Sequence, residues 1–449
     1  MAFAAAGGTI LLCLASIAGV HVATLAWPLS LSTKENLRSA AVPLVTSAPG
    51  HGFSDMQPLK HIVGKARVVA LGEATHGTRE FFLVKHRILE YLVAEMGFEI
   101  FALEASWPDC ARVNDYVVNG RGDPRLALGG LGFWTWDTEE VLALILWMRQ
   151  WNEDPSHERK VTFTGFDMQN PASSARALKE YLTKAAPDQF TELDAILPIV
   201  LEARAGRTPG HGQSAVLRRA VSNLAARIDQ NRASLVARSS EEEWAVMRHH
   251  ARLLCQYEEM CRGGSQNVRH RLNVRDQAMA ENALWALARG GHAAKMVVWA
   301  HNGHVSFDAR APQTPMGAHL RRALGSDFVS FGLVFGHGSF QARSGVKEPP
   351  REFTVQPAFR GSLEWGLQQI GHPLLVLDLR QVPRGSEAAT WLARRRGTRE
   401  VGALFDPAQE DRVWSQQVVV DRFDAIVFSE STTRSRPLGS LPTAAGTGH

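Results

Sequence analysis

Residues 68–82 read VVALGEATHGTREFF, a short apolar run that gives way within a few residues to a helix-forming segment. The run lacks polar alternation and is rich in valine, which is typical of a strand covered on both faces of a parallel sheet. Glu73 and His76 stand three residues apart where this strand ends. The stretch therefore predicts the first half of a βαβ unit, with an acid and an imidazole in the loop that follows the strand.

The helix after this loop has a start and an end in the sequence. Thr78 can serve as its N-cap, Glu80 is favourable in its first turn, and Gly97 can close it. Apolar residues recur between these ends at helical spacing: Phe81, Val84, Ile88, Leu92 and Met96. This stripe predicts an amphipathic helix that packs on the sheet.

Six further apolar runs predict strands of the same sheet. They cover residues 98–104, 161–167, 295–301, 328–335, 374–380 and 424–430. Helical stretches lie between them, so the predicted fold class is α/β, with a mostly parallel central sheet flanked by helices.

The segment 172–290 contains helical patterns and no convincing strand. We expect a large all-helical insertion here that forms one side of a deep cleft. The predicted α/β catalytic domain then comprises residues 61–171 and 291–435. Residues 1–60 are expected to hold an apolar segment and a linker, and residues 436–449 a disordered tail.

The composition is that of an ordinary globular chain. Of 449 residues, 45% are hydrophobic and 21% are charged, and the 49 cationic and 45 anionic residues are interleaved rather than gathered in blocks. A nucleic-acid partner is therefore not expected. The four cysteines form neither a CxxC pair nor a metal-like cluster, and they do not decide the redox compartment.

Residues 9–31 are almost wholly apolar, which suits a signal segment or a marginal membrane anchor. No Lys or Arg precedes Lys34, so the basic start of a signal peptide is missing. Two alternatives stay open: an exported or anchored protein, whose only membrane contact is this segment, and a cytoplasmic protein with an apolar extension. The oligomeric state is not predicted.

Ionisable residues gather where the predicted strands end. Glu73 and His76 follow the first strand, Glu104 ends the second, Asp167 ends the third, and His301 and His304 follow a fourth in the sequence AHNGH. Because the carboxyl ends of parallel strands meet at one edge of a sheet, we expect these residues to share a site.

Acid and imidazole together can activate water. A glutamate beside a histidine holds one ring tautomer and makes the free nitrogen a better base. Glu104 is expected to hold or position the water, and the HNGH turn to supply a second imidazole that polarises a carbonyl or stabilises the oxyanion. The same residue types also suit zinc or iron, so a metal site stays open at this point. The GxSxG, HExxH and phosphate-loop signatures are absent from the sequence.

Tryptophans stand at two places that suit the wall of a pocket. Trp107 stands just past Glu104, and Trp134 lies in the sequence GFWTWDTEE. We expect Trp107, Trp134 and Asp167 to contact a bulky ligand.

Several ordered motifs resemble the erythromycin esterase family. They are ALGEATHGTREFFLVKHRILEYLV, FALEASWPDCARVNDYV, GFDMQ, RDQAMAENALWAL, WAHNGHV, PMGAHLRRALG and FDAIVFSESTT, and they extend over roughly residues 60–435. The resemblance implies a metal-independent hydrolase without a cofactor that opens a macrolide lactone, or a related ester, by activated water and without a covalent intermediate. It also implies a role in antibiotic resistance.

On this resemblance His76 would be the general base, Glu73 and Glu104 its acidic partners, and His301 and His304 the remaining histidines of the site. Lys85 departs from the pattern, because macrolide esterases tend to carry an arginine there. A lysine keeps the positive charge but lacks the planar bidentate fork of arginine.

Two other functions are weighed against the esterase: a metal-dependent hydrolase with the same residues as ligands, and a non-catalytic protein that binds haem or a secondary metabolite.

Overall fold

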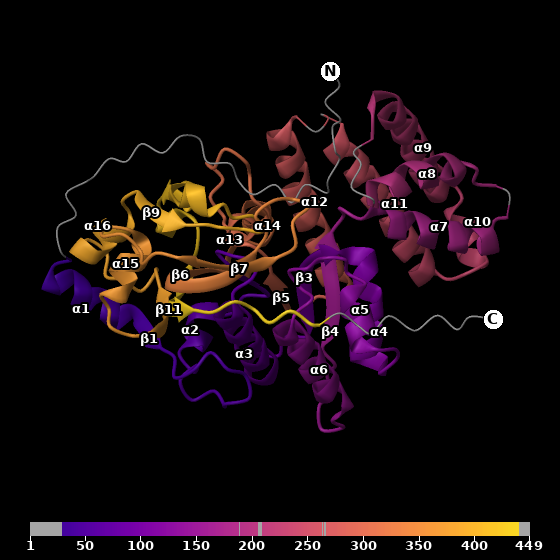
Figure 1. Cartoon of the computed structure of the whole chain (residues 1–449). Helices are drawn as coiled ribbons and strands as arrows, with labels where there is room; N and C mark the ends of the chain where they lie inside the picture. The colour runs from indigo at the N-terminus through magenta and orange to yellow at the C-terminus, as the bar shows by residue number, and fades with distance from the viewer. Residues whose placement is uncertain (1–28, 188, 205–208, 263, 265, 440–449) are drawn as a thin grey trace, which may run out of the picture.

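The computed structural model describes residues 29–187, 189–204, 209–262, 264 and 266–439. A nine-stranded sheet runs through one part of it, and a group of helices lies to one side (Figure 1). Most of the predicted apolar segment 9–31 and of the predicted tail 436–449 lies outside the described residues.

The main sheet has the strand order β1-β8-β11-β6-β2-β5-β3-β4, with β7 paired to β6. The six strands from β11 to β4 in this order run parallel to their neighbours, whereas β8 is antiparallel to β11, β1 to β8, and β7 to β6. Their bounds are β1 (Ala41–Pro43), β2 (Val68–Leu71), β3 (Ile100–Ser106), β4 (Thr162–Asp167), β5 (Met296–Trp299), β6 (Phe328–Ala342), β7 (Arg351–Val355), β8 (Leu374–Asp378) and β11 (Ala425–Thr432).

All seven strands predicted from apolar runs are present, and the α/β class with a mostly parallel sheet flanked by helices is confirmed. The strands that were not predicted are short or polar. They are β1, β7 and a separate antiparallel pair, β9 (Arg396–Arg399) and β10 (Trp414–Gln417). None of these contains a sustained apolar run, which was the signal used for the others.

The helices fill the connections between these strands. Their bounds are α1 (Leu31–Ala40), α2 (Leu59–Val63), α3 (Arg79–Met96), α4 (Cys110–Asn119), α5 (Pro124–Gly129), α6 (Glu139–Glu153), α7 (Pro171–Ala185), α8 (Glu192–Arg204), α9 (His211–Gln230), α10 (Arg232–Ala237), α11 (Glu241–Cys261), α12 (Val268–Arg289), α13 (Asn302–Val305), α14 (Met316–Leu324), α15 (Leu363–Gln368) and α16 (Glu387–Leu392).

Alternate residues of each central strand belong to two different cores. Val69 and Leu71 of β2 pack in the cluster that includes α3 and α6, whereas Val68 and Ala70 pack in the cluster that includes α12 and α14. Figure 1 shows these helix pairs on opposite sides of the sheet. Period-two alternation of buried residues on both faces explains why the strands read as unbroken apolar runs.

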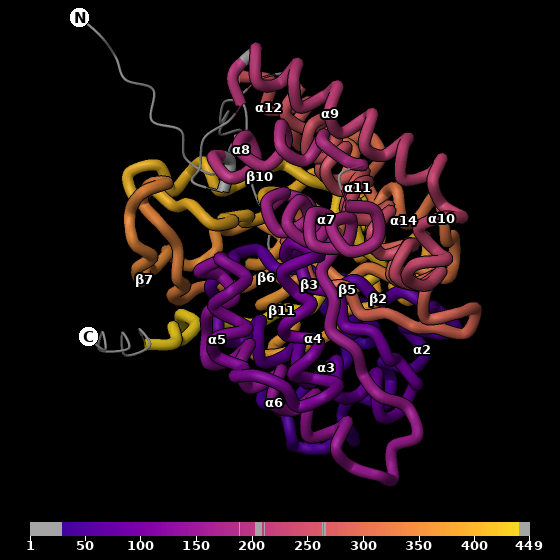
Figure 2. The backbone as a smooth tube through the Cα atoms, turned by 90° about the vertical axis from the view of Figure 1, so that its right-hand side faces the viewer, coloured from indigo at the N-terminus to yellow at the C-terminus, as the bar shows by residue number. Residues whose placement is uncertain are grey.

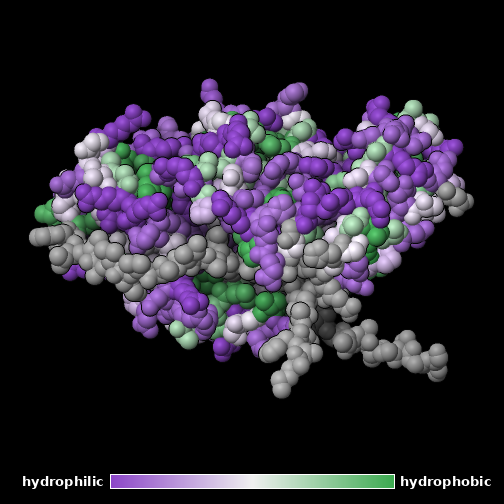
Figure 3. Space-filling view, turned by 90° about the horizontal axis from the view of Figure 1, so that it is seen from above, coloured by the Kyte–Doolittle hydropathy of each residue, from purple (hydrophilic) through white to green (hydrophobic). Residues whose placement is uncertain are grey.

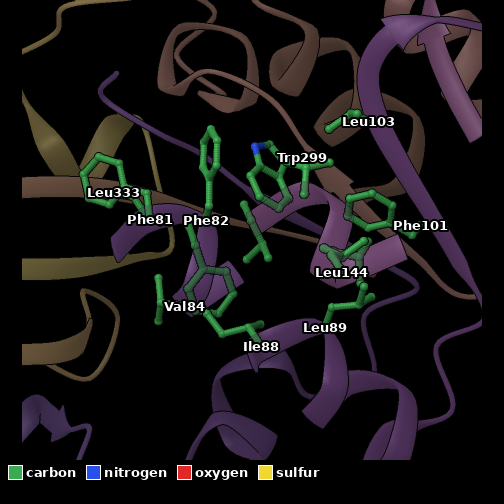
Figure 4. Packing of buried hydrophobic residues seen from close by; sticks show 14 of the residues in the cluster. Phe81, Phe82, Val84, Ile88, Leu89, Phe101, Leu103, Leu144, Trp299 and Leu333 are labelled. Carbon is green, nitrogen blue, oxygen red and sulfur yellow. The ribbon is translucent and has the colours of Figure 1, made fainter. Parts of the chain in front are cut away.

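Several aromatic rings pack in the core under α3. Figure 4 shows Phe81 and Phe82 of α3 among the side chains that gather near Trp299 of β5 and Phe101 of β3. The rings of Phe82 and Trp299 lie 5.1 Å apart, and those of Phe101 and Trp299 lie 6.0 Å apart, both edge to face. This packing fixes Trp299, whose indole nitrogen reaches the site described below.

In the described part of the segment 172–290, regular structure is helical throughout. Helices α7 to α11 share their own core, and Figures 1 and 2 show them grouped beside the sheet. Helix α12 packs against both β4 and α11, so it connects this group to the sheet. The assignment of these helices to a separate domain stays a prediction.

The sheet begins earlier in the chain than the proposed boundary at residue 61. Strand β1 pairs with β8 through Ala41, Val42 and Pro43, so the linker predicted over residues 1–60 contains an edge strand of the main sheet. Across the described residues, no helix combines the length and the apolar character that crossing a membrane requires. Figure 3 shows hydrophilic side chains over most of one face, with apolar patches between them.

Gly72 lies at a close approach between β2 and two neighbouring elements. Its N–H donates to the Phe331 carbonyl at 2.8 Å, and a Cβ on this residue would lie 2.1 Å from Asn302 Oδ1. The Asn302 amide in turn bonds both the N–H and the carbonyl of Leu333 in β6, at 3.0 and 2.9 Å. A side chain at position 72 would therefore displace the residue that ties α13 to the sheet.

We predict that Gly72→Ala lowers the free energy of unfolding by about 1–3 kcal/mol, the usual range for an overfilled core. Gly129→Ala is the matched control, because a Cβ at the end of α5 would meet nothing within 4 Å. Urea unfolding of the two variants measures the difference. Equal stability of both variants would contradict the packing described.

Candidate active site

The loop after β2 is held by backbone hydrogen bonds from two distant segments. The Val401 N–H donates to the Ala74 carbonyl at 2.7 Å, and the Asn302 N–H donates to the Glu73 carbonyl at 2.9 Å. Gly402 adds a longer contact, because its carbonyl accepts from the His76 N–H at 3.4 Å. The loop that carries Glu73 and His76 is thus fixed by residues that follow β5 and β9.

The Glu73 carboxylate is fully buried and accepts three hydrogen bonds. Oε1 accepts from His76 Nδ1 at 2.7 Å, and Oε2 accepts from Lys85 Nζ at 2.6 Å and from Trp299 Nε1 at 2.8 Å. A buried carboxylate needs such partners, since an unpaired one would be strongly disfavoured. The donors come from the loop itself, from α3 and from β5.

This arrangement sets the tautomer of His76. A carboxylate only accepts hydrogen bonds, so the Nδ1 that faces Glu73 carries the proton and Nε2 presents a lone pair. No hydrogen-bond partner of Nε2 occurs in the described chain, and the side chain is 8% exposed. The ring lies 6.1 Å from Trp136 and 5.0 Å from the His301 ring.

Lys85 is buried between Glu73 and the face of Trp299, with Nζ 4.2 Å from the ring centroid. Burial lowers the pKa of Lys85 to about 8, and the Glu73 carboxylate opposes this shift. Lys85 therefore carries its charge at neutral pH, and it faces Glu73 rather than open solvent.

Glu104 stands at the end of β3, where a register shift against β4 interrupts the regular ladder. Oε1 pairs with Arg275 Nη2 at 2.6 Å, and Oε2 accepts the His301 N–H at 2.9 Å. Burial raises the pKa of Glu104, but the charges of His304, Arg275 and His76 outweigh it and hold that pKa well below its usual range. Glu104 is therefore ionised, with both oxygens engaged.

Arg275 of α12 bridges the acids at the ends of two neighbouring strands. Its Nη2 also lies 2.8 Å from Asp167 Oδ2, where β4 ends. Asp167 additionally accepts from the Met168 N–H and from Gln169, each at 2.7 Å. The prediction that Asp167 contacts a ligand stays untested; its described contacts are with Arg275 and its own loop.

Both nitrogens of His304 are engaged. Nδ1 contacts Asp276 Oδ1 at 2.7 Å, and Nε2 lies 3.0 Å from Arg275 Nη1 and 3.4 Å from Glu104 Oε1. Burial lowers the pKa of His304, but the carboxylates of Asp276 and Glu104 outweigh burial and raise it above the ordinary value. His304 is thereby suited to organise the charges rather than to take a proton from water.

His301 caps the short helix α13. Its Nδ1 accepts the Gly303 N–H at 3.1 Å, which leaves the single proton of the neutral ring on Nε2. Burial, together with the neighbouring His76 and His304, lowers the pKa of His301 well below the ordinary value. The three imidazoles therefore differ: His76 presents an open lone pair, His301 an N–H, and His304 neither.

The sequence reasoning gave no individual role to four residues of this cluster: Arg275, Asp276, Trp299 and Glu400. Three of them have charged side chains. Arg275 and Asp276 lie in the motif RDQAMAENALWAL, which gave the family resemblance but no role for single residues. Glu400 follows the unpredicted strand β9. Trp299 was read only as part of a strand, and its indole nitrogen gave no separate signal.

The prediction that Trp107 and Trp134 contact a ligand stays untested. Trp107 packs against His249, His250 and Trp285, and it lines a surface groove beside β4 with a volume of about 460 Å³. Trp134 lies near Arg343, 5.9 Å from its guanidinium. Trp136 is the tryptophan of this loop that contacts His76, and its indole N–H donates to the Glu104 carbonyl at 3.0 Å.

The charged groups of the cluster are bonded largely to one another. A metal ion at His304 would have to displace the Arg275 guanidinium, which is itself a cation. Over the residues that the structure describes, no three of His, Cys, Asp or Glu are grouped so that they could hold a metal ion.

Comparisons with known proteins agree on the family. The family model described as Erythromycin esterase matches residues 93–432, a span that includes Glu104, Arg275, His301 and His304 and begins after His76. Erythromycin esterase type II of Escherichia coli is 22% identical over 382 residues, which are 78% of this chain and 89% of that protein. The putative hydrolase YbfO of Bacillus subtilis is 22% identical over 411 residues, 85% of this chain and 87% of that protein.

Solved structures show the same fold. A Bacillus cereus protein is 26% identical with a TM-score of 0.81, and the match covers 92% of this chain and all of that one, 100%. A mutant of the erythromycin esterase EreC in its open conformation is 18% identical with a TM-score of 0.67, and the match covers 87% of this chain and 96% of that one.

We predict that Arg275→Met destabilises the fold by roughly 3–5 kcal/mol at neutral pH, because it leaves the carboxylates of Glu104 and Asp167 buried without their cation. Arg269→Met, an exposed position on the same helix, is the control and should change little. Urea unfolding measures both.

The loss of stability in Arg275→Met should depend on pH in a defined direction. The folded pKa of Glu104 lies below its ordinary value of 4.5, so its pairing stabilises the fold above pH 4.5, and this contribution is lost as the pH falls toward the folded pKa. The deficit of Arg275→Met should therefore narrow in acid. A deficit that is absent at neutral pH would contradict the ion network.

Proposed function

The chain belongs to the erythromycin esterase family, and on that premise we propose that it hydrolyses a macrolide lactone or a related ester with water activated by His76. The observation that carries this proposal is the open Nε2 of His76, whose other nitrogen is bonded to the buried Glu73 carboxylate at 2.7 Å. In the described chain it is the imidazole of this cluster with a free lone pair.

The proposed reaction needs one water and no covalent intermediate. His76 Nε2 takes a proton from water while the water oxygen forms a bond to the ester carbonyl carbon. The tetrahedral intermediate then expels the alkoxide, and the His76 imidazolium returns the proton to that oxygen. The products are a carboxylic acid and an alcohol. General base catalysis of this kind supplies roughly 100- to 10,000-fold in rate.

Positive charge near the reacting carbonyl is part of the same proposal. The Arg275 guanidinium sits beside His304, and its side chain is 13% exposed. Arg275, oriented by His304, is proposed to stabilise the oxyanion, since fixed donors in a buried site need no reorganisation during the reaction. Glu104 holds Arg275 and the His301 backbone in place, which is a positioning role.

The substrate class rests on the relatives. The named relatives include two erythromycin esterases of Escherichia coli. Inactivation of such an antibiotic would confer resistance.

We predict that incubation with erythromycin, or with another macrolide of a panel, yields a product heavier by one water. His76→Ala should slow the reaction roughly 100- to 10,000-fold and leave the fold intact. His292→Ala, which changes an exposed histidine, should leave the rate unchanged. Mass spectrometry measures the products, and thermal unfolding checks the fold.

Two results would count against the proposal. If no macrolide or simple lactone is hydrolysed by the folded protein, a binding role would be favoured. If exhaustive chelation abolishes activity and added metal restores it, the reaction would be that of a metal-dependent hydrolase.

We further predict that kcat/KM declines as the pH rises through about 8, because Lys85 then loses the charge that balances Glu73. Below that pH Lys85 is protonated and its ion pair with Glu73 is preserved. In Lys85→Arg the decline should move to much higher pH, since a guanidinium keeps its proton up to about pH 12. Identical pH profiles of the two proteins would show that Lys85 does not control the decline of kcat/KM at alkaline pH.

A further inference from the structure

Behind the candidate site, a carboxylate and an imidazole face each other without a partner for either facing atom. Glu400 Oε2 lies 3.7 Å from His301 Nε2, and each side chain is 8% exposed. In the described chain both atoms are buried and lack a hydrogen bond. Such orphaned atoms are rare in folded proteins. A shift of less than 1 Å would bring this pair within hydrogen-bond distance.

The proton needed for such a bond is already on His301. Because Nδ1 accepts the Gly303 N–H at 3.1 Å, a neutral ring carries its hydrogen on Nε2. That N–H lies on the side of Glu400. The carboxylate can accept it, so donor and acceptor are matched in type as well as in place.

The backbone fixes Glu400 between the second sheet and the catalytic loop. Its N–H donates to the Val413 carbonyl at 2.8 Å, and the next residue, Val401, donates to Ala74 at 2.7 Å. Arg399, one residue earlier, packs over the rings of Phe335 and Trp414 at 5.0 and 4.6 Å. The Glu400 side chain faces His301, whereas that of Arg399 lies against these two rings.

The two oxygens of Glu400 have different surroundings. Oε1 pairs with Arg422 Nη1 at 2.8 Å, whereas Oε2 faces His301. The ion pair with Arg422 balances the buried charge. It leaves the second oxygen available for the imidazole.

We propose that Glu400 is a positioning residue that holds His301 by its Nε2–H and, through the His301 ring, keeps His76 in place. The rings of His301 and His76 lie 5.0 Å apart at an interplanar angle of 42°. The backbone N–H of His301 donates to Glu104 Oε2 at 2.9 Å. Glu400, His301 and His76 thus form a row that ends at the open nitrogen of the base. The catalytic consequence rests on the proposed function, whereas the contact itself does not.

The kinetic test separates this role from a simple ion pair. Glu400→Gln should lower kcat roughly 10- to 100-fold with little change in KM, the size of effect expected when a reacting group is slightly misplaced. Glu241→Gln, which breaks an exposed ion pair with Arg232, is the matched control and should have no effect.

The double variant Glu400→Gln/Arg422→Met removes both charges of the buried pair, so it should fold even if a single variant does not. If Glu400 acts through His301, the double variant stays as slow as Glu400→Gln. If Glu400 only balances Arg422, the double variant regains the wild-type kcat, and that result would overturn the proposal.

A spectroscopic test needs no substrate. In protein labelled with ¹⁵N-histidine, the His301 Nε2–H resonance, assigned by its loss in His301→Gln, should shift in Glu400→Gln and in the double variant but not in Glu241→Gln. An unchanged resonance would refute the contact. Absence of esterase activity in the wild-type protein would instead refute the proposed function, so the two failures are distinguishable.

Discussion

The buried carboxylate of Glu73 is the constraint on which the candidate site depends. It lies inside the protein without access to water, so both of its oxygens need hydrogen-bond donors. His76, Lys85 and Trp299 supply them, from the loop after β2, from α3 and from β5. The same contacts that make burial tolerable also set the His76 tautomer and draw α3 toward β5. Stability and chemistry therefore rest on one group.

A second network connects the sheet to the helical segment. Arg275 reaches from α12 to the acids at the ends of β3 and β4, and it contacts His304 at 3.0 Å. Because α12 also packs on α11, the charge pairing that organises the site is coupled to the placement of the helices beside it. The two networks meet at His301. Its ring lies against His76, and its backbone N–H donates to the Glu104 carboxylate.

The sequence could predict those parts of the molecule that leave a local pattern. Seven strands were found because their residues face two cores, which makes them apolar without interruption. Glu73 and His76 were found because one turn of loop separates them. Arg275 could not be singled out, because a charged residue inside a helix reads like any solvent-facing one.

Other residues escaped for different physical reasons. Glu400 follows β9, whose sequence RGTR contains no apolar run because that strand pairs only with the short β10. Trp134 and Trp136 stand two residues apart in one loop, and only the fold decides which ring turns toward His76.

The central claim is that Glu73 keeps the His76 proton on Nδ1 and leaves Nε2 free, and ¹⁵N NMR of histidine-labelled protein at neutral pH tests it most directly. The account predicts that Nδ1 is protonated, Nε2 is unprotonated, and Glu73→Gln disturbs this preference; a proton found on Nε2 in the wild type would contradict it.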